Sequence, residues 1–244
     1  MILRPKESTM RPVHASDQVL QLGPDELLST TRTVRKRLDL DRPVPRAVVG
    51  RCLELAAQAP SGENSQPYRW IVVDDPDLRV EMARIYRAAT VDFVAELRAA
   101  KAGEAPDPLV RLGMDVDLTD PAARRIGSSV AHLRDNLHRV PVLVVPVLTT
   151  RVERMSVFEH ASTWGSVLPA VWSFMLALRS RGLGSAWTTA HLHREAQMAD
   201  LLGIPFAETT QVGLFPVAYT VGTGFRPGRR GPIERITSWN GWRF

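Results

Sequence analysis

The segment from Thr163 to Arg181 constrains the fold more than any other part of the chain. Its residues are apolar on nearly all sides of a helix, and such a helix must be covered by other elements. Gly182-Leu183-Gly184 follows it, and glycine is typical of the position just after a helix. The segment therefore predicts a helix inside the core, around which the rest of the chain packs.

Helix-like and strand-like segments alternate along the rest of the chain. Apolar residues at three- and four-residue intervals predict helices, and short β-branched or aromatic runs between turn residues predict strands. The predicted helices are Pro24–Thr31, Pro45–Ala59, Asp77–Ala100, Ala122–Arg139 and Glu195–Leu202. The predicted strands are Tyr68–Val73, Val142–Leu148, Ser185–Thr189 and Gln211–Thr220. Pro146 favours an edge or an irregular position for the second strand, because proline cannot donate a ladder hydrogen bond.

No linker, repeat or low-complexity tract divides this pattern, so we expect one mixed α/β domain over residues 25–244. Residues 1–24 are interpreted as an N-terminal arm. Residues 101–120 are polar, contain Gly and Pro, and have no clear period, which is typical of a long loop or lid. Residues Ile233–Phe244 form a tail with two tryptophans.

Composition excludes several classes of protein. Hydrophobic residues make up 44% of the chain and charged residues 23%, which is close to an ordinary globular protein and excludes wholesale disorder. Cys52 is the single cysteine, so no internal disulfide can form, and a reducing cytosol is favoured. The longest apolar runs, Val140–Leu148 and Ser166–Leu178, are shorter than the about 20 residues that cross a bilayer. The N-terminus shows no export signal. We expect a cytoplasmic protein without a membrane partner.

The charge balance favours an anionic partner. Lys and Arg number 31 against 26 Asp and Glu, which gives a net charge of +5 and a pI near 10.0. Nucleic acid, an acidic membrane and a phosphate-bearing small molecule all suit this balance. No recognition-helix motif or basic strand with interleaved aromatic residues supports nucleic acid.

Familiar catalytic and metal sites are missing from the sequence. It has neither a Gly-x-x-x-x-Gly-Lys phosphate loop nor a Gly-x-Ser-x-Gly nucleophile elbow. Trp187 stands where the third glycine of a dinucleotide fingerprint belongs. His191 and His193 have no nearby Cys or acid at ligand spacing, so they are interpreted as core or solvated histidines and no metal site is expected.

Four polar segments remain as candidates for a binding site. In Thr31–Arg35, Arg32 and Arg35 are three residues apart and can clamp one anion from one face of a helical turn. Pro60–Pro67 is dense in amides and hydroxyls. Gly182–Thr189 combines glycines, which let a backbone approach a ligand, with one ring and two hydroxyls. Gly228–Pro232 is basic. The plain alternatives are a solvated basic run, a Pro/Gly turn, a helix cap entering a core strand, and a flexible basic loop.

The order of these segments resembles the FMN-dependent nitroreductase family, and is similar to an actinobacterial subgroup of it. The motifs are TTRTVRKRLD (30–39), DRPVP (41–45), PSGENSQPY (60–68), LRSRGLGSAWTT (178–189), LGIP (202–205) and RRGPIE (229–234). The resemblance runs from about Asp25 to Trp242. It implies an α+β three-layer sandwich, with a central mixed or antiparallel sheet flanked by helices. It also implies a homodimer with the flavin at the subunit interface.

The resemblance further implies a set of flavin-binding residues. These are Arg32, Thr33, Arg35, Pro60, Ser61, Gly62, Asn64, Trp187, Thr188, Thr189, Arg229 and Arg230. Arg32 or Arg35, together with Arg230, would bind the phosphate or place positive charge near the pyrimidine edge of the ring. The sequence departs from the family pattern at Thr31, where many members have another arginine, and at Tyr68, which replaces a tryptophan.

The implied activity needs no catalytic side chain, because the flavin itself carries the chemistry. NAD(P)H would deliver hydride to FMN in a ping-pong cycle, and a nitroaromatic, quinone or similar electron-poor acceptor would then be reduced in the same place. The alternative within the fold is other flavin chemistry, namely an oxidase, dehalogenase or biosynthetic dehydrogenase. The alternative from another class is a basic nucleic-acid-binding protein, which only the pI favours.

Overall fold

The computed structural model describes residues 19–114 and 120–244. The helices are α1 (Pro24–Thr30), α2 (Arg46–Ala56), α3 (Pro76–Lys101), α4 (Pro108–Arg111), α5 (Pro121–Asn136), α6 (Val157–Ser180) and α7 (Glu195–Leu202). The strands are β1 (Tyr68–Val73), β2 (Val142–Leu148), β3 (Leu183–Ser185), β4 (Thr210–Gln211) and β5 (Phe215–Tyr219). Short 3-10 turns cover Gly62–Asn64, Leu137–Arg139, Ala190–Arg194 and Ile233–Ile236.

The strands form one antiparallel sheet with β2 in its middle. The order is β1-β2-β5-β3, and β4 pairs with β2. Tyr68 lies opposite Leu148 in the β1–β2 pair, and Val142 lies opposite Val217 in the β2–β5 pair. The expected central antiparallel sheet is therefore confirmed.

Pro146 lies at a break in this sheet and not at its edge. β2 pairs with β5 as far as Val144 and with β4 from Val147 onward, so Pro146 faces the point where the partner changes. Its missing N–H costs little there, and its carbonyl still accepts a hydrogen bond of 2.9 Å from the backbone N–H of Val212. Of the two positions predicted for β2, the edge position is thus wrong and the irregular position is correct. The segment Gln211–Thr220, which was predicted as one strand, contains parts of two strands, β4 and β5.

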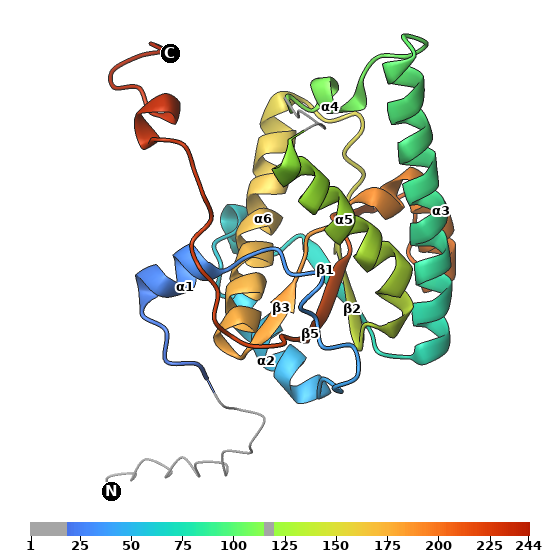
Figure 1. The fold of residues 1–244 in the computed structure, drawn as a ribbon, viewed down its shortest axis with the longest axis vertical. Helices are drawn as coiled ribbons and strands as arrows, with labels where there is room; N and C mark the ends of the chain where they lie inside the picture. Colours follow the sequence, from blue (N-terminus) through green and yellow to red (C-terminus); the bar gives the residue numbers. More distant parts are fainter. Residues whose placement is uncertain (1–18, 115–119) are drawn as a thin grey trace, which may run out of the picture.

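Helices cover both faces of the sheet, as Figure 1 shows with α6 and α3 on opposite sides of the strands. Alternate residues of β2 point to opposite faces. Val142 and Val144 belong to the core shared with α2 and α6, whereas Leu143 and Val145 belong to the core shared with α3 and α7. The chain thus has two hydrophobic cores separated by the sheet, which confirms the three-layer α+β architecture.

The central apolar helix, α6, begins six residues before the predicted start. Ser156 and Glu159 form a capping box that satisfies the first backbone N–H groups, and this local signal sets the start at Val157. The helix ends as predicted, with Gly182 in a left-handed conformation at φ 72°. Phe174 and Leu178 are fully buried, but Phe158 is 78% exposed. Phe158 precedes the predicted segment Thr163–Arg181, within which Trp172 is 42% exposed, so the predicted core position holds for one side of the helix and not for all of it.

At 24 residues α6 is longer than the predicted apolar segment, which was too short to cross a bilayer. Among the described residues it is the one helix that is long and apolar enough to cross a membrane, with a mean hydropathy of 1.3 over its most apolar window. In this structure 44% of that window is buried, against α2 and the sheet. Its buried residues between Val167 and Leu178 belong to the core shared with α2 and the sheet.

Several predicted boundaries shift by a few residues. β1 and α7 have the predicted bounds, whereas α2 is shorter than predicted and α5 ends at Asn136. β3 covers Leu183–Ser185 and not Ser185–Thr189. α3 extends to Lys101 and α4 lies within the expected loop of residues 101–120. Residues 1–18 of the arm and 115–119 of the loop lie outside the described residues.

Candidate functional site

Two of the four polar segments lie side by side. Thr33 forms a parallel bridge with Ser185, and the backbone N–H of Val34 donates to the carbonyl of Ser185 at 2.8 Å. Gly184 makes this approach possible, because a Cβ there would lie 2.9 Å from Cβ of Val34 and 2.7 Å from a methyl carbon of Thr220. The side chains of Val34 and Thr220 thus fill the space beside Gly184.

Arg32 and Arg230 converge at Gly228. A Cβ on Gly228 would lie 3.2 Å from the guanidinium carbon of each arginine, so the two carbons lie within twice that distance of each other. Arg32 donates to the carbonyl of Arg226 at 2.8 Å, and Arg230 donates to the carbonyl of the exposed Arg229 at 2.9 Å. Neither pairs with a carboxylate among the described residues. Two such cations repel each other, and an anion between them removes the repulsion.

Arg35 lies apart from this pair. Its guanidinium donates to the Ser129 hydroxyl of α5 at 3.3 Å, and burial lowers the pKa of Arg35, although an arginine stays protonated at neutral pH. Arg35, Thr33, Ser129 and Phe225 line a hollow of about 210 Å³. Arg230, rather than Arg35, is therefore the close neighbour of Arg32.

Buried polar groups without partners lie next to the Arg32 segment. Arg179 of α6 is 5% exposed and donates to the Thr30 hydroxyl at 3.3 Å, and its Nε and Nη1 have no partner among the described residues. The buried hydroxyls of Ser185 and Thr188 also lack partners within the described ranges 19–114 and 120–244. Arg179 and Ser185 line a narrow hollow together with Arg32. Unsatisfied donors around several arginines fit a phosphate-bearing ligand better than a neutral one.

Trp187 and Thr189 flank Thr188 where the chain enters the core. The ring of Trp187 packs against Phe215 with centroids 5.5 Å apart, and its N–H donates to the carbonyl of Val212 at 3.2 Å. Thr188 pairs with Leu214 through the backbone. Trp187 and Thr189 are exposed. A ring and a hydroxyl of this segment thus reach the surface.

The loop Pro60–Gln66 is strained and polar. Glu63, Asn64 and Gln66 have φ angles of 51°, 54° and 44°, a region that non-glycine residues rarely occupy. The Gln66 amide donates to the side chains of Asn64 and Ser61 at 2.6 and 3.2 Å. Such strain is concentrated at binding sites, where it is part of the mechanism.

This loop lies far from the arginines along α6. The N–H of Gly62 donates to the hydroxyl of Ser166, in the middle of α6, at 2.9 Å. Arg32 instead lines a hollow together with Arg179, near the C-terminal end of the same helix. Ser166 and Arg179 are about 20 Å apart along the helix axis. Among the described residues no hydrogen bond or hollow joins Ser61, Gly62 and Asn64 to the Arg32 segment.

Comparison with known proteins agrees with the fold and the order of motifs. The family model described as "Nitroreductase family" matches residues 28–219. The chain belongs to the nitroreductase family. Rat iodotyrosine deiodinase 1 is 27% identical over 201 residues, which cover 80% of this chain and 61% of the relative. The chain therefore spans about three-fifths of the length of this curated relative.

Solved structures of the same fold include an iodotyrosine deiodinase bound to FMN and 3-iodo-L-tyrosine, which is 21% identical. Its TM-score is 0.62, and the match covers 89% of this chain and 99% of that one. The FMN and NADPH-dependent nitroreductase NfnB from sphigopyxis sp. strain HMH is 22% identical with a TM-score of 0.59, over 91% and 100% of the two chains. At these identities the likeness shows the nitroreductase fold alone.

The sequence of this nitroreductase-family chain did not predict that Arg179 and Phe225 belong to the candidate site. An arginine on a helix that is otherwise apolar was the available signal for Arg179. Phe225 lies in the Gly/Arg-rich loop after β5, and it lines the hollows beside both Arg32 and Arg35. Contacts between segments so distant in sequence leave no local pattern.

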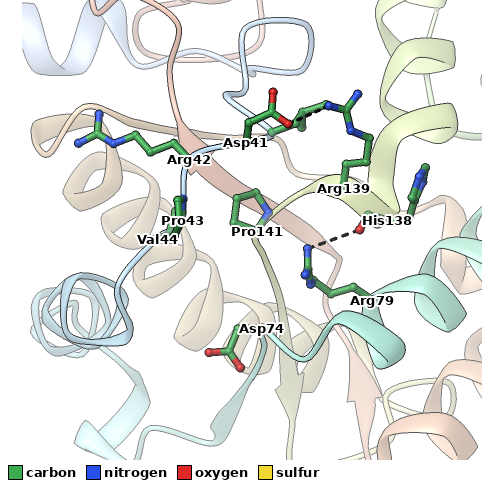
Figure 2. Close-up of a pocket in the computed structure, with 10 residues that line it drawn as sticks. Asp41, Arg42, Pro43, Val44, Asp74, Arg79, His138, Arg139 and Pro141 are labelled. Atoms are coloured by element: carbon green, nitrogen blue, oxygen red, sulfur yellow. Dashed lines mark hydrogen bonds and ion pairs between the residues drawn. The ribbon is translucent and has the colours of Figure 1, made fainter.

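A separate hollow of about 490 Å³ lies at the opposite end of β1 from the loop Pro60–Gln66 (Figure 2). Asp41 pairs there with Arg139 at 2.9 Å, and Arg79 donates to the carbonyl of Val140 at 2.7 Å. Its lining includes none of the residues that the family resemblance implies.

Proposed function

We propose that this chain is an FMN-dependent oxidoreductase that takes electrons from NAD(P)H. The observation that carries the proposal is the convergence of Arg32 and Arg230, which have no carboxylate partner among residues 19–114 and 120–244, beside the unsatisfied donors of Arg179 and Ser185. This cluster offers charge-assisted hydrogen bonds to a phosphate dianion. Bound FMN would supply the hydride and electron transfer, whereas the chain binds, orients and shields it.

We further propose that two chains build each site. The strained loop at Asn64 presents amides and hydroxyls for a polar ring, but it lies about 20 Å along α6 from the arginines. A second copy can bring its own loop to the arginines of the first. Phe158 and Trp172 on α6, and Trp239 and Trp242 in the tail, expose apolar surface that suits such a contact.

The proposed acceptor is a small, electron-poor molecule such as a nitroaromatic or a quinone. NfnB, which shares the fold, is named as a nitroreductase and supports this choice. Reductive dehalogenation of an aromatic ring is the second candidate, because the curated relative at 27% identity is a deiodinase. The remaining alternatives, an oxidase and a biosynthetic dehydrogenase, have no comparable support.

The FMN site is tested by titration of the apo-protein with FMN, followed by flavin fluorescence. Each of Arg32→Gln and Arg230→Gln should weaken binding by about 10- to 100-fold, because each loses a charge-assisted hydrogen bond. Arg84→Gln on the exposed face of α3 is the matched control and should bind as wild type. A folded wild-type protein that binds no FMN would contradict the proposal.

The reaction is tested by anaerobic mixing of the FMN-loaded protein with NADH or NADPH. Loss of the flavin absorption shows that the protein accepts hydride, and no loss with either nucleotide contradicts the NAD(P)H proposal. A nitroaromatic and an iodophenol are then offered separately to the reduced protein. Reoxidation by the first favours nitro reduction, and release of iodide from the second favours dehalogenation.

A further inference from the structure

We propose that Arg37 is a positioning residue for the phosphate of FMN. It would act by holding the loop of residues 221–230, called here the arginine loop, in the place from which Arg230 meets Arg32. This inference rests on the proposed function and names a residue outside the set that the family resemblance implies.

Arg37 uses its whole guanidinium on the arginine loop. Nε donates to the carbonyl of Val221 at 3.0 Å, Nη2 to that of Gly222 at 2.6 Å, and Nη1 to that of Gly224 at 3.0 Å. The backbone of Arg37 also accepts a hydrogen bond of 2.8 Å from the N–H of Val221. Four hydrogen bonds thus fix the start of the loop to Arg37.

Phe225 adds an aromatic contact to this attachment. The guanidinium carbon of Arg37 lies 4.0 Å from the centroid of the Phe225 ring, and that of the buried Arg179 lies 5.0 Å from it. Both distances allow a cation–π interaction. The ring therefore joins the loop to α6 as well as to Arg37.

The attachment leads directly to the proposed phosphate site. Arg226 follows Phe225, and its carbonyl accepts the hydrogen bond from Arg32. Gly228, two residues further, is where Arg32 and Arg230 meet. No helix or strand forms between β5 and Ile233, so side-chain contacts of this kind hold the loop.

The chemistry requires arginine at position 37. A guanidinium presents five donors in a fixed plane and can serve three carbonyls at once. Lysine keeps the charge but not this fork. Without this fork the arginine loop should become mobile. The affinity for a flavin with a phosphate should then fall, and the affinity for a flavin without a phosphate should not.

The test compares FMN with riboflavin, which lacks the phosphate, in wild type, Arg37→Gln, Arg37→Lys and Phe225→Leu. Both Arg37 variants should bind FMN at least 10-fold more weakly and riboflavin as wild type does, and Phe225→Leu should show a smaller effect of the same kind. Arg42→Gln is the matched control, because Arg42 stacks on Tyr219 at 3.5 Å and does not touch the loop. Its affinities for both flavins should be unchanged.

In the flavin titrations two results would overturn the inference: unchanged FMN affinity in Arg37→Gln, or equal loss of both flavins, which indicates general damage. Trypsin digestion of the apo-protein supplies a readout that does not depend on flavin. Cleavage after Arg229 and Arg230 should be faster in Arg37→Gln than in wild type or Arg42→Gln. If wild type binds no FMN, the proposed function fails, and unchanged cleavage is the separate result that refutes the role of Arg37.

Discussion

One buried imidazole shows how a single residue can set the pH dependence of stability. His191 lies in the 3-10 turn before α7, has no exposed surface, and finds no hydrogen-bond partner for either ring nitrogen in the part of the chain that the structure describes. Burial lowers the pKa of His191 to about 4, and the neighbouring Gln211 side chain offsets part of this shift. The imidazole is therefore neutral in the folded protein at all but acidic pH.

The sign of the effect on stability follows from this lowered pKa. Between pH 6.5 and 4 the unfolded chain binds a proton at His191 that the folded chain does not, so the free energy of unfolding falls as the pH falls. From pH 7 to pH 5 the loss should be about 2 kcal/mol. Urea unfolding of wild type and His191→Leu at both pH values measures it. The variant should lose less stability than wild type on acidification, and equal losses would contradict the prediction.

At the scale of elements, β3 depends on the absence of a side chain at Gly184. Gly184→Ala should lower the free energy of unfolding by about 1–3 kcal/mol, because its Cβ would lie closer than 3 Å to Val34 and Thr220. Gly127→Ala on α5 is the matched control, since a Cβ there meets nothing within 4 Å. It should raise stability by up to about 1 kcal/mol, as alanine does in a helix. Chemical denaturation distinguishes the two, and effects of the same sign would contradict this account.

Elements with strong local signals were predictable from sequence. The periodicity of α7, the β-branched run of β1 and the glycine after α6 all specify their structures within a few residues. The break beside Pro146 was only half predictable, because the residue indicates irregularity but not which strands change partner there. The start of α6 was missed because its first turns are polar or exposed, although Ser156 and Glu159 carry a capping-box pattern.

The candidate site was less accessible to sequence reasoning than the fold. The motifs identified Arg32 and Arg230, but only the structure shows that they meet at Gly228 and that Arg35 turns to α5. Arg37 and Arg179 act through contacts with residues more than 40 positions away, and no local pattern encodes those contacts.

At the scale of the whole molecule, the proposed dimer can be tested through α6. Trp172 is 42% exposed on the helix that carries the loop Pro60–Gln66 on its flank. Trp172→Glu should produce monomers and weaken FMN binding by at least 10-fold, because a charge in an apolar contact is costly. Light scattering after gel filtration gives the mass. Val80→Glu on the exposed face of α3 is the control and should leave both properties unchanged.

The separation of the strained loop from the arginines by the length of α6 has a genetic consequence. If each site takes its arginines from one chain and its loop from the other, then a variant damaged at Arg230 and a variant damaged at Asn64 are defective in different halves. A mixed pair of the two contains one site with both defects and one site with neither. When two inactive alleles are expressed in one cell, each mixed dimer should therefore have up to half of the activity of a wild-type dimer. A cell that expresses either allele alone should have no activity.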